Sequence, residues 1–270
     1  MNRTIPVNIP SHDAHTGLTN LEGWAYRLSR HWILILSIIF GLYVGLPFLA
    51  PVLMRLGWDI PARAIYFIYS LLCHQLPQRS YFLFGSKVSY SIAEIQTVWQ
   101  NTLNPLVLRQ FIGNPELGWK VAWSDRMVSM FTSLWLVGML WRPLRRWLKP
   151  LPWWGLVFLL LPMAVDGASH GISDLYGIGQ GFRDSNTWLV MLTNNTFPPG
   201  FYAGDAWGSF NSLMRLLTGI LFGVGIVWFG YSFLDDSFSQ QAHYLKSKLN
   251  FDQRKNVKGS IQASSGKPLS

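Results

Sequence analysis

Two long apolar runs dominate the hydrophobic pattern of the chain. Residues 32–54 and residues 216–234 contain no charged side chain. A helix of either length can cross the ~30 Å hydrocarbon core of a bilayer. Neither run has the polar face that a helix of this length would carry on the surface of a soluble protein. The pattern therefore predicts two membrane-spanning helices.

Three weaker apolar segments cover residues 64–85, 121–141 and 151–170, and each carries polar side chains inside it or at one end. Their lengths allow all three to cross a bilayer, so we predict an all-α integral membrane helical bundle with five membrane segments. Pro77 interrupts the first of them, and proline breaks or bends a helix. Four full spans plus a re-entrant segment over residues 64–85 is therefore the alternative.

Composition supports a membrane protein. Half of the residues are hydrophobic and 13% are charged, against roughly 25% charged in a soluble domain. The net charge of +9 comes from basic residues that cluster beside apolar segments, which favours orientation in a membrane over nucleic-acid binding. The single cysteine excludes an internal disulfide and a thiolate zinc cage. The expected partner is the lipid bilayer, with no nucleic acid.

The basic residues also predict the orientation. The loop 142–149 carries four positive charges, and further lysines and arginines follow residue 234. Basic loops face the cytoplasm, so we place this loop and the C-terminus there, in a multi-pass protein of the cell membrane. The side of the N-terminus stays open, because five segments place it outside and four place it inside. The predicted organisation is a polar segment 1–30, a membrane domain 31–234 with external loops near 86–120 and 171–209, and a basic cytoplasmic tail 235–270.

This topology brings polar side chains from four distant segments to the outer membrane face. Charged groups within a membrane segment are costly, so they are usually paired or functional. The candidate site residues are His74, Arg79, Asp125, Arg126, Asp166, His170, Asn211 and Arg215.

A metal site is one interpretation of these residues. His74, Asp125, Asp166 and His170 supply two imidazoles and two carboxylates, a ligand set that suits zinc or a similar divalent metal. A metal there would make a bound water nucleophilic at neutral pH, with His74 and Asp166 as the catalytic candidates. The structural alternatives are ion pairs for Asp125 and Asp166 and a backbone hydrogen bond for His170.

An anion-binding pocket is the second interpretation of the same residues. Guanidinium groups match phosphate and carboxylate groups bidentately. Arg79, Arg126, Arg215 and Asn211 are the predicted substrate-binding residues.

Gly219 and Gly223 form a G-x-x-x-G pair in the last apolar run. Small residues at this spacing let two helix backbones approach closely. The pair fits packing inside the bundle, and a homo-oligomer through the Gly219/Gly223 face is the alternative.

Three motifs resemble an uncharacterised family of bacterial multi-pass membrane proteins, a domain of unknown function with a C-H-Q-x-P-x-R-S hallmark. They are CHQLPQRS from Cys73, LPMAVDG at 161–167 and MRLLTGILFG at 214–223. The resemblance covers about residues 60–234 and implies the membrane architecture and the importance of His74, Arg79, Asp166 and Arg215. Where the family carries a C-A-R-C-T-G-I-Y element, this chain has SDRMVSMF at 124–131, without the two cysteines. A thiolate role is therefore doubtful here, and the resemblance names no reaction.

The sequence thus predicts a membrane protein with a polar pocket at the outer face that binds, and in an enzymatic version processes, an anionic lipid-like or small substrate. Whether the chain is an enzyme stays open. The alternatives are a transporter or permease component and a non-catalytic membrane scaffold.

Overall fold

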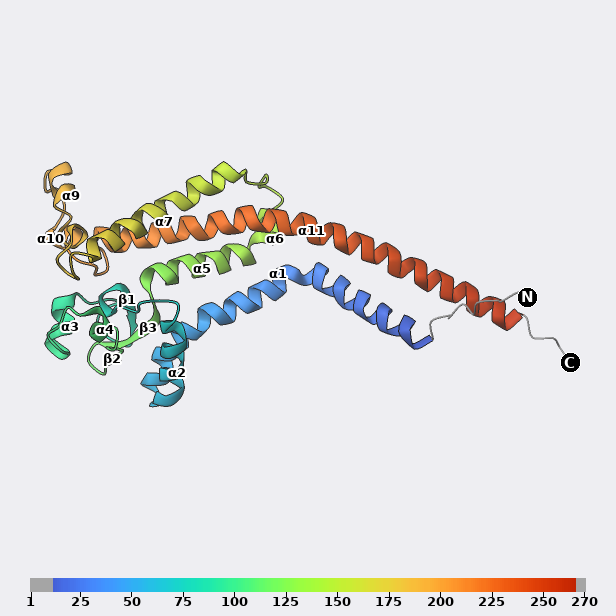
Figure 1. The fold of residues 1–270 in the computed structure, drawn as a ribbon, viewed down its shortest axis with the longest axis horizontal. Coiled ribbons are helices and arrows are strands. Elements are labelled where there is room, and N and C mark those ends of the chain that lie inside the picture. The colour runs from blue at the N-terminus through green and yellow to red at the C-terminus, as the bar shows by residue number, and fades with distance from the viewer. Residues whose placement is uncertain (1–11, 266–270) are drawn as a thin grey trace, which may run out of the picture. The chain divides into compact units, whose positions relative to one another are not determined.

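The computed structural model describes residues 12–265, with side chains described for residues 20–248. In chain order the elements are α1 (His12–Arg55), α2 (Asp59–Ser70), the 3-10 turn η1 (Pro77–Arg79), β1 (Ser80–Leu83), α3 (Ile92–Val98), α4 (Pro105–Leu108), β2 (Gly113–Asn114), β3 (Gly118–Ser124), α5 (Asp125–Met139), α6 (Trp141–Leu144), α7 (Trp153–Asp174), α8 (Phe182–Ser185), α9 (Thr187–Leu192), α10 (Pro199–Tyr202) and α11 (Phe210–Ser265) (Figure 1). Helices dominate, and the described strands all lie between α2 and α5.

The chain divides into two compact units. The main unit is Ser37–Tyr231, and the terminal unit consists of the residues before Ser37 and after Tyr231. Helices α1 and α11 each contribute to both units.

Three helices of the described chain are long and apolar enough to cross a membrane. They are α1 over Asn20–Arg55, α7 over Trp153–Asp174 and α11 over Phe210–Lys248. The apolar segments predicted at residues 32–54, 151–170 and 216–234 thus lie in long helices that could span a membrane.

The segment 64–85 differs from the continuous span that we expected. Helix α2 ends at Ser70, and the chain continues through a loop and η1 into strand β1. Gln75 has a φ of 50°, a left-handed conformation that does not occur inside a helix, and Pro77 begins η1. These two residues stop a helix that the apolar composition alone would continue.

The segment 121–141 also differs from the expectation. Its first residues belong to strand β3, and helix α5 is 15 residues long. At 1.5 Å per residue such a helix covers about 22 Å, less than the ~30 Å of a bilayer core. The expected five helical segments are therefore three long helices and a shorter α5.

A small antiparallel sheet corrects the all-α prediction. The strand order is β1-β3-β2, with Ser80 opposite Ser124 and Leu83 opposite Trp119. Strand β3 leads directly into α5. The sheet therefore fixes the start of α5 next to the end of the η1 turn.

Helices α5 and α11 run parallel and in close contact. Ser129 Oγ donates to Arg215 O at 3.0 Å, and Ser133 Oγ to Gly219 O at 3.4 Å. A Cβ on Gly219 would lie 2.1 Å from Ser129 Oγ, and one on Gly223 would lie 2.1 Å from Ser133 Oγ. The Gly219/Gly223 face is thus filled by α5 of the same chain, so it is not free for the second copy considered above.

Helix α1 runs antiparallel to α5. Trp135 Nε1 donates to Ser37 O at 2.9 Å, and Phe131, about one turn earlier in α5, packs edge-on against Tyr43 with ring centroids 5.0 Å apart. In the terminal unit the early part of α1 lies beside the late part of α11, where Trp32 stacks on Phe238 at 5.4 Å.

The loop that carries His74 and Arg79 is fixed by buried polar contacts. Gln75 Nε2 donates to Tyr66 O and to Ala122 O, both at 2.9 Å. Lys120 Nζ donates to Gln75 O at 2.8 Å and to Arg109 O at 2.7 Å. Helix α2, this loop and strand β3 are therefore locked together, which explains why a glutamine follows His74 in the motif.

Candidate functional site

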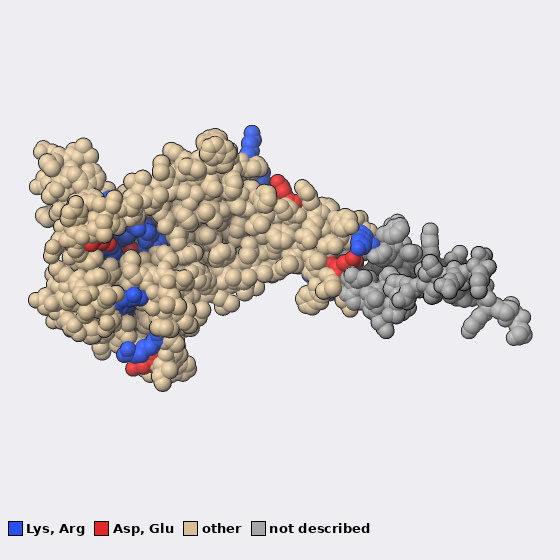
Figure 2. Space-filling view, in the orientation of Figure 1, with Lys and Arg blue, Asp and Glu red and all other residues tan. Residues whose placement is uncertain are grey.

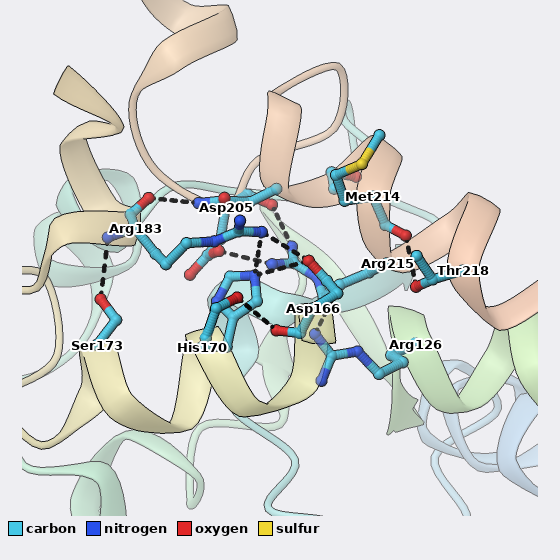
Figure 3. A network of polar contacts seen from close by, with 12 residues as sticks. Arg126, Asp166, His170, Ser173, Arg183, Asp205, Met214, Arg215 and Thr218 are labelled. Carbon is cyan, nitrogen blue, oxygen red and sulfur yellow. Dashed lines mark hydrogen bonds and ion pairs between the residues drawn. The ribbon is translucent and has the colours of Figure 1, made fainter. Parts of the chain in front are cut away.

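The candidate site lies where the beginnings of α5 and α11, the last turns of α7 and the η1 turn meet (Figure 3). Arg215, near the start of α11, is central. Its Nε donates to both carboxylate oxygens of Asp125, at 2.9 and 2.8 Å. Its Nη1 donates to Asp205 Oδ1 at 2.7 Å, and its Nη2 donates to Asp205 O at 3.0 Å. All the nitrogens of this guanidinium are engaged.

Arg79 is held in the same way. Its Nε donates to Asp205 Oδ2 at 2.8 Å. Its Nη1 and Nη2 donate to the two oxygens of Asp174 at 2.6 and 2.8 Å. Burial alone would raise the pKa of Asp205, but the charges of Arg79 and Arg215 hold it below its usual value. Asp205 is therefore an ionised bridge between the two arginines.

Asp166 bridges two further arginines. Its Oδ2 accepts from Arg126 Nη2 at 2.6 Å, and its Oδ1 accepts from Arg183 Nη2 at 2.6 Å (Figure 3). Arg183 Nη2 also lies 3.1 Å from His170 Nε2. A guanidinium can only donate, so His170 Nε2 accepts and the imidazole carries its proton on Nδ1.

Four arginines and four aspartates make up this network, so their formal charges cancel. They are Arg79, Arg126, Arg183, Arg215, Asp125, Asp166, Asp174 and Asp205. Most of these side chains are buried, and a buried charge is tolerated only when it is paired and hydrogen-bonded. The network therefore holds α5, α7 and α11 together at this end of the main unit.

A cavity of about 180 Å³ opens on one side of the network. It is lined by Leu72, Cys73, His74, Arg79, Ser124, Asp125, Arg126, Met127, His170 and Arg215. Three arginines line it but only one aspartate, because Asp166, Asp174 and Asp205 lie behind their arginine partners. In Figure 2 basic and acidic side chains gather in a hollow on a mostly uncharged face of the main unit. The network is neutral, but the cavity wall is basic.

Two buried hydrogen-bond donors on residues that line the cavity have no partner within the described part of the chain. They are Arg126 Nε and His170 Nδ1. His74 Nδ1 accepts from Leu76 N at 3.3 Å, so in the neutral imidazole the proton lies on Nε2. Desolvation and the charge of Arg79 lower the pKa of His74 to about 4, so this imidazole is neutral at pH 7. His74 is exposed, so its Nε2 is open to solvent or to a ligand, whereas Arg126 Nε and His170 Nδ1 are buried donors without a partner.

The N-terminus of α5 also faces the cavity. Ser124, Asp125, Arg126 and Met127 are consecutive lining residues at the first turn of this helix. The N-terminus of a helix carries a partial positive charge. The helix therefore adds to the positive character of the cavity.

The predicted metal-ligand set is only partly brought together. Asp166 and His170 lie on one face of α7, with His170 Nε2 3.9 Å from Asp166 Oδ1, but Asp125 and Asp166 are each held by arginines. Among the side chains described, those of residues 20–248, no group of three or more histidines, cysteines, aspartates or glutamates could hold a metal ion. The ion-pair interpretation of the two aspartates fits the structure better than the metal site.

Asn211, predicted to bind substrate, lies outside the cavity lining. Its Nδ2 donates to Arg183 O at 2.6 Å and to Gly204 O at 2.9 Å. Its Oδ1 accepts from Asn186 Nδ2 at 3.3 Å. Asn211 therefore fixes the loops before α11 and has no free group to offer a ligand.

The sequence analysis missed three members of the network, Asp174, Arg183 and Asp205. Asp174 ends α7, and the other two lie in the region predicted to be an external loop. A charge balance would have indicated them, because the predicted buried arginines outnumbered their acidic partners. No local motif marks these residues.

A second cavity, of about 210 Å³, lies beyond Asp205. It is lined by Gln78, Ser91, Ile92, Ala93, Gly179, Asp184, Gly204 and Asp205. Both polar atoms of the buried Gln78 amide lack a partner in the described chain. Since Arg79 and Arg215 line the first cavity and bind Asp205, these ion pairs separate the two cavities.

Comparisons with known proteins agree with a membrane protein. Residues 116–229 match the model of a family described as "Predicted membrane protein (DUF2085)". The chain is 28% identical over 186 residues to an uncharacterised protein of Methanocaldococcus jannaschii, MJ1492, covering 66% of this chain and 87% of that protein. No solved structure matches the chain. The family match includes LPMAVDG at 161–167 and MRLLTGILFG at 214–223 but not CHQLPQRS, and the description of the family states no activity.

Proposed function

We propose that the cavity binds the anionic group of a lipid-like or small substrate at the outer face of the cell membrane. The single observation that carries this proposal is the pair of buried donors without a partner, Arg126 Nε and His170 Nδ1, on residues that line one cavity together with the exposed His74. A buried donor without a partner costs free energy, and an anion offers several acceptor oxygens at once. Phosphate and carboxylate are the groups that an arginine-lined cavity recognises.

The outer face follows from the basic loop. Arg142, Arg145, Arg146 and Lys149 lie between α5 and α7, and basic loops favour the cytoplasm. The cavity lies at the other ends of both helices, next to Asp125 and His170. With the shorter α5 counted as a fourth crossing beside α1, α7 and α11, the proposal places both termini on the cytoplasmic side, as in the four-span alternative.

Processing of the substrate is a further step that the arrangement supports less strongly. Asp166 is engaged by two arginines, so it positions Arg126 and Arg183 better than it would serve as a base. His74 is neutral and lines the cavity, and it is the group best suited to exchange a proton with a ligand. We therefore retain His74 as the catalytic candidate of an enzymatic version and treat Asp166 as a positioning residue.

Two alternatives have support of their own. Two cavities separated by the ion pairs of Asp205 with Arg79 and Arg215 are what a transporter with an ion-pair gate would show. The cancelling charges of the network are what a non-catalytic scaffold would need. Neither alternative explains the unpartnered donors of the first cavity.

Calorimetric titration of the purified protein with inorganic phosphate tests the proposal. A hydrogen bond to a charged group contributes about 1.5–3 kcal/mol, so Arg126→Gln should weaken binding by about 10- to 100-fold. Arg146→Gln, the same change on an exposed residue of the basic loop, should leave the affinity unchanged. Equal binding by both variants, or no binding by the wild type, would contradict an anion site at the cavity.

A further inference from the structure

Helix α2 has apolar side chains on both of its faces. One face packs into the main unit through Ala62, Tyr66 and Tyr69, all buried. The opposite face carries Ile60, Phe67 and Leu71, which are 85%, 68% and 75% exposed. These residues follow one another at helical spacing, so they form a continuous apolar strip. We refer to Ile60, Phe67, Ile68 and Leu71 as the α2 strip.

The α2 strip continues the lipid-facing surface of α1. Within the main unit, α1 exposes Leu42, Leu46 and Leu49, and this helix is a candidate membrane span. Three residues separate α1 from α2, and Gly57 has a φ of 77°, which lets the chain turn sharply between them. Because the apolar surface of α1 continues around this turn onto the α2 strip, we infer that lipid acyl chains contact both helices.

The length of α2 decides how it can meet the membrane. Twelve residues cover about 18 Å as a helix, too short for the ~30 Å core. Trp58, which precedes α2, is exposed, as are most tryptophans in the interfacial belt of a membrane protein. Arg63 is also exposed on α2 and would lie at the level of lipid headgroups. These features fit a helix that lies in the interface.

The α2 strip leads to the mouth of the first cavity. Leu71 and Leu72 are both exposed, and Leu72 lines the cavity together with Cys73 and His74. The cavity wall therefore combines the apolar Leu72 and Met127 with the polar Arg126 and His170. A molecule with an anionic head and an apolar tail matches both kinds of side chain.

We propose that α2 lies in the membrane interface with the α2 strip in contact with lipid, and that the first cavity takes its anion from the headgroup of a bilayer lipid that enters past Leu72. This inference rests on the proposed anion site and names the source of its ligand. The lipid reaches the cavity laterally, without leaving the membrane. Its headgroup meets Arg126, His74 and His170, and its tail stays along the α2 strip.

Fluorescence quenching by spin-labelled lipids tests the position of α2. A nitrobenzoxadiazole dye is attached at Phe67→Cys or Leu71→Cys, and at the exposed Glu116→Cys as the control, in nanodiscs of phosphatidylcholine with doxyl-labelled acyl chains. Cys73 is buried, and labelling of the wild type measures its background. The proposal expects loss of fluorescence at both α2 positions and little loss at the control. Quenching of all three sites to the same low extent would overturn it.

A second experiment distinguishes the two sources of the anion. Thermal unfolding is measured for the wild type and Arg126→Gln in nanodiscs of phosphatidylcholine, in the same nanodiscs with inorganic phosphate, and in nanodiscs that contain phosphatidylglycerol. The proposal expects phosphatidylglycerol to raise the midpoint of the wild type and to have a smaller effect on the variant. Stabilisation by phosphate but not by phosphatidylglycerol would overturn the lipid inference and leave the anion site intact. No effect of either would contradict the anion site itself.

Discussion

Arg126 donates from Nη2 to Asp166 at 2.6 Å, while its Nε has no partner in the described chain. About 20% of its side chain is exposed, against 5% or less for Arg79 and Arg215. Asp166 thus fixes one edge of the guanidinium and leaves another edge for a ligand. Arg126 is therefore the arginine of the network best placed to bind a ligand while it keeps its contact with Asp166.

The buried pair of Asp125 and Arg215 should be essential for stability. Replacing Asp125 by Asn leaves the buried guanidinium without its carboxylate, and breaking a buried ion pair costs about 3–5 kcal/mol. We expect a clear fall in the thermal unfolding midpoint in detergent. Glu94→Gln removes the partner of the exposed Lys87 and should leave the midpoint nearly unchanged. Similar midpoints for the two variants would show that the network does not hold the main unit together.

The contact between α5 and α11 should tolerate no added methyl group at Gly219. Its Cβ would lie 2.1 Å from Ser129 Oγ, and overpacking of this kind costs about 1–3 kcal/mol. Gly219→Ala should therefore lower the unfolding midpoint. Gly230→Ala is the matched control, because nothing lies within 4 Å of a Cβ there.

Removing the obstructing hydroxyl should rescue this variant. In the double variant Gly219→Ala with Ser129→Ala, the nearest remaining contact is the Ser129 Cβ position at 3.0 Å. A double-mutant cycle should show that the two changes together cost less than their sum. Purely additive costs would mean that the two helices do not meet at these residues.

Lys120 should make stability depend on pH. Lys120 is fully buried, and its Nζ donates to two backbone carbonyls. A neutral amine has two N–H bonds, so these two carbonyls satisfy all of its donors. Burial lowers its pKa to about 7 from the usual 10.5. Between these values the unfolded chain binds a proton that the folded chain does not, so stability rises with pH by up to about 1.4 kcal/mol per unit.

Lys120→Met separates this effect from other titrations. The free energy of unfolding is compared at about pH 7.5, 8.0, 8.5 and 9.0, where tyrosines with a pKa near 10 stay mostly protonated. The wild type should gain stability relative to the variant across this range, whatever the absolute cost of the substitution. Parallel pH profiles for the two proteins would show that Lys120 is charged in the folded state.

The long helices could be predicted from the sequence because an uninterrupted apolar run of this length is typical of a membrane-spanning helix. Residues 32–54 and 216–234 form α1 and α11 for this reason. The short sheet could not be predicted in this way. Strand β3 is almost completely buried, so it lacks the alternation of polar and apolar residues that marks a half-exposed strand.

The convergence of the polar residues followed from topology alone, but their pairing did not. The predicted orientation of α5, α7 and α11 was enough to bring Asp125, Asp166 and Arg215 to one end. Which carboxylate meets which guanidinium depends on Arg183 and Asp205, which come from the connection between α7 and α11. Residues in loops follow no periodic pattern, so the sequence could not place Arg183 and Asp205. Without them, the sequence could not decide between a metal site and ion pairs.

Nitrogen-15 NMR of the histidines, with inorganic phosphate as the probe, tests the anion site most directly. The account predicts that His170 is protonated on Nδ1 and His74 on Nε2, and that phosphate shifts both N–H signals. The exposed His243 should not respond, and Arg126→Gln should weaken the response of the other two. Signals of His74 and His170 that stay unchanged at saturating phosphate, or a His170 protonated on Nε2, would contradict the proposed site.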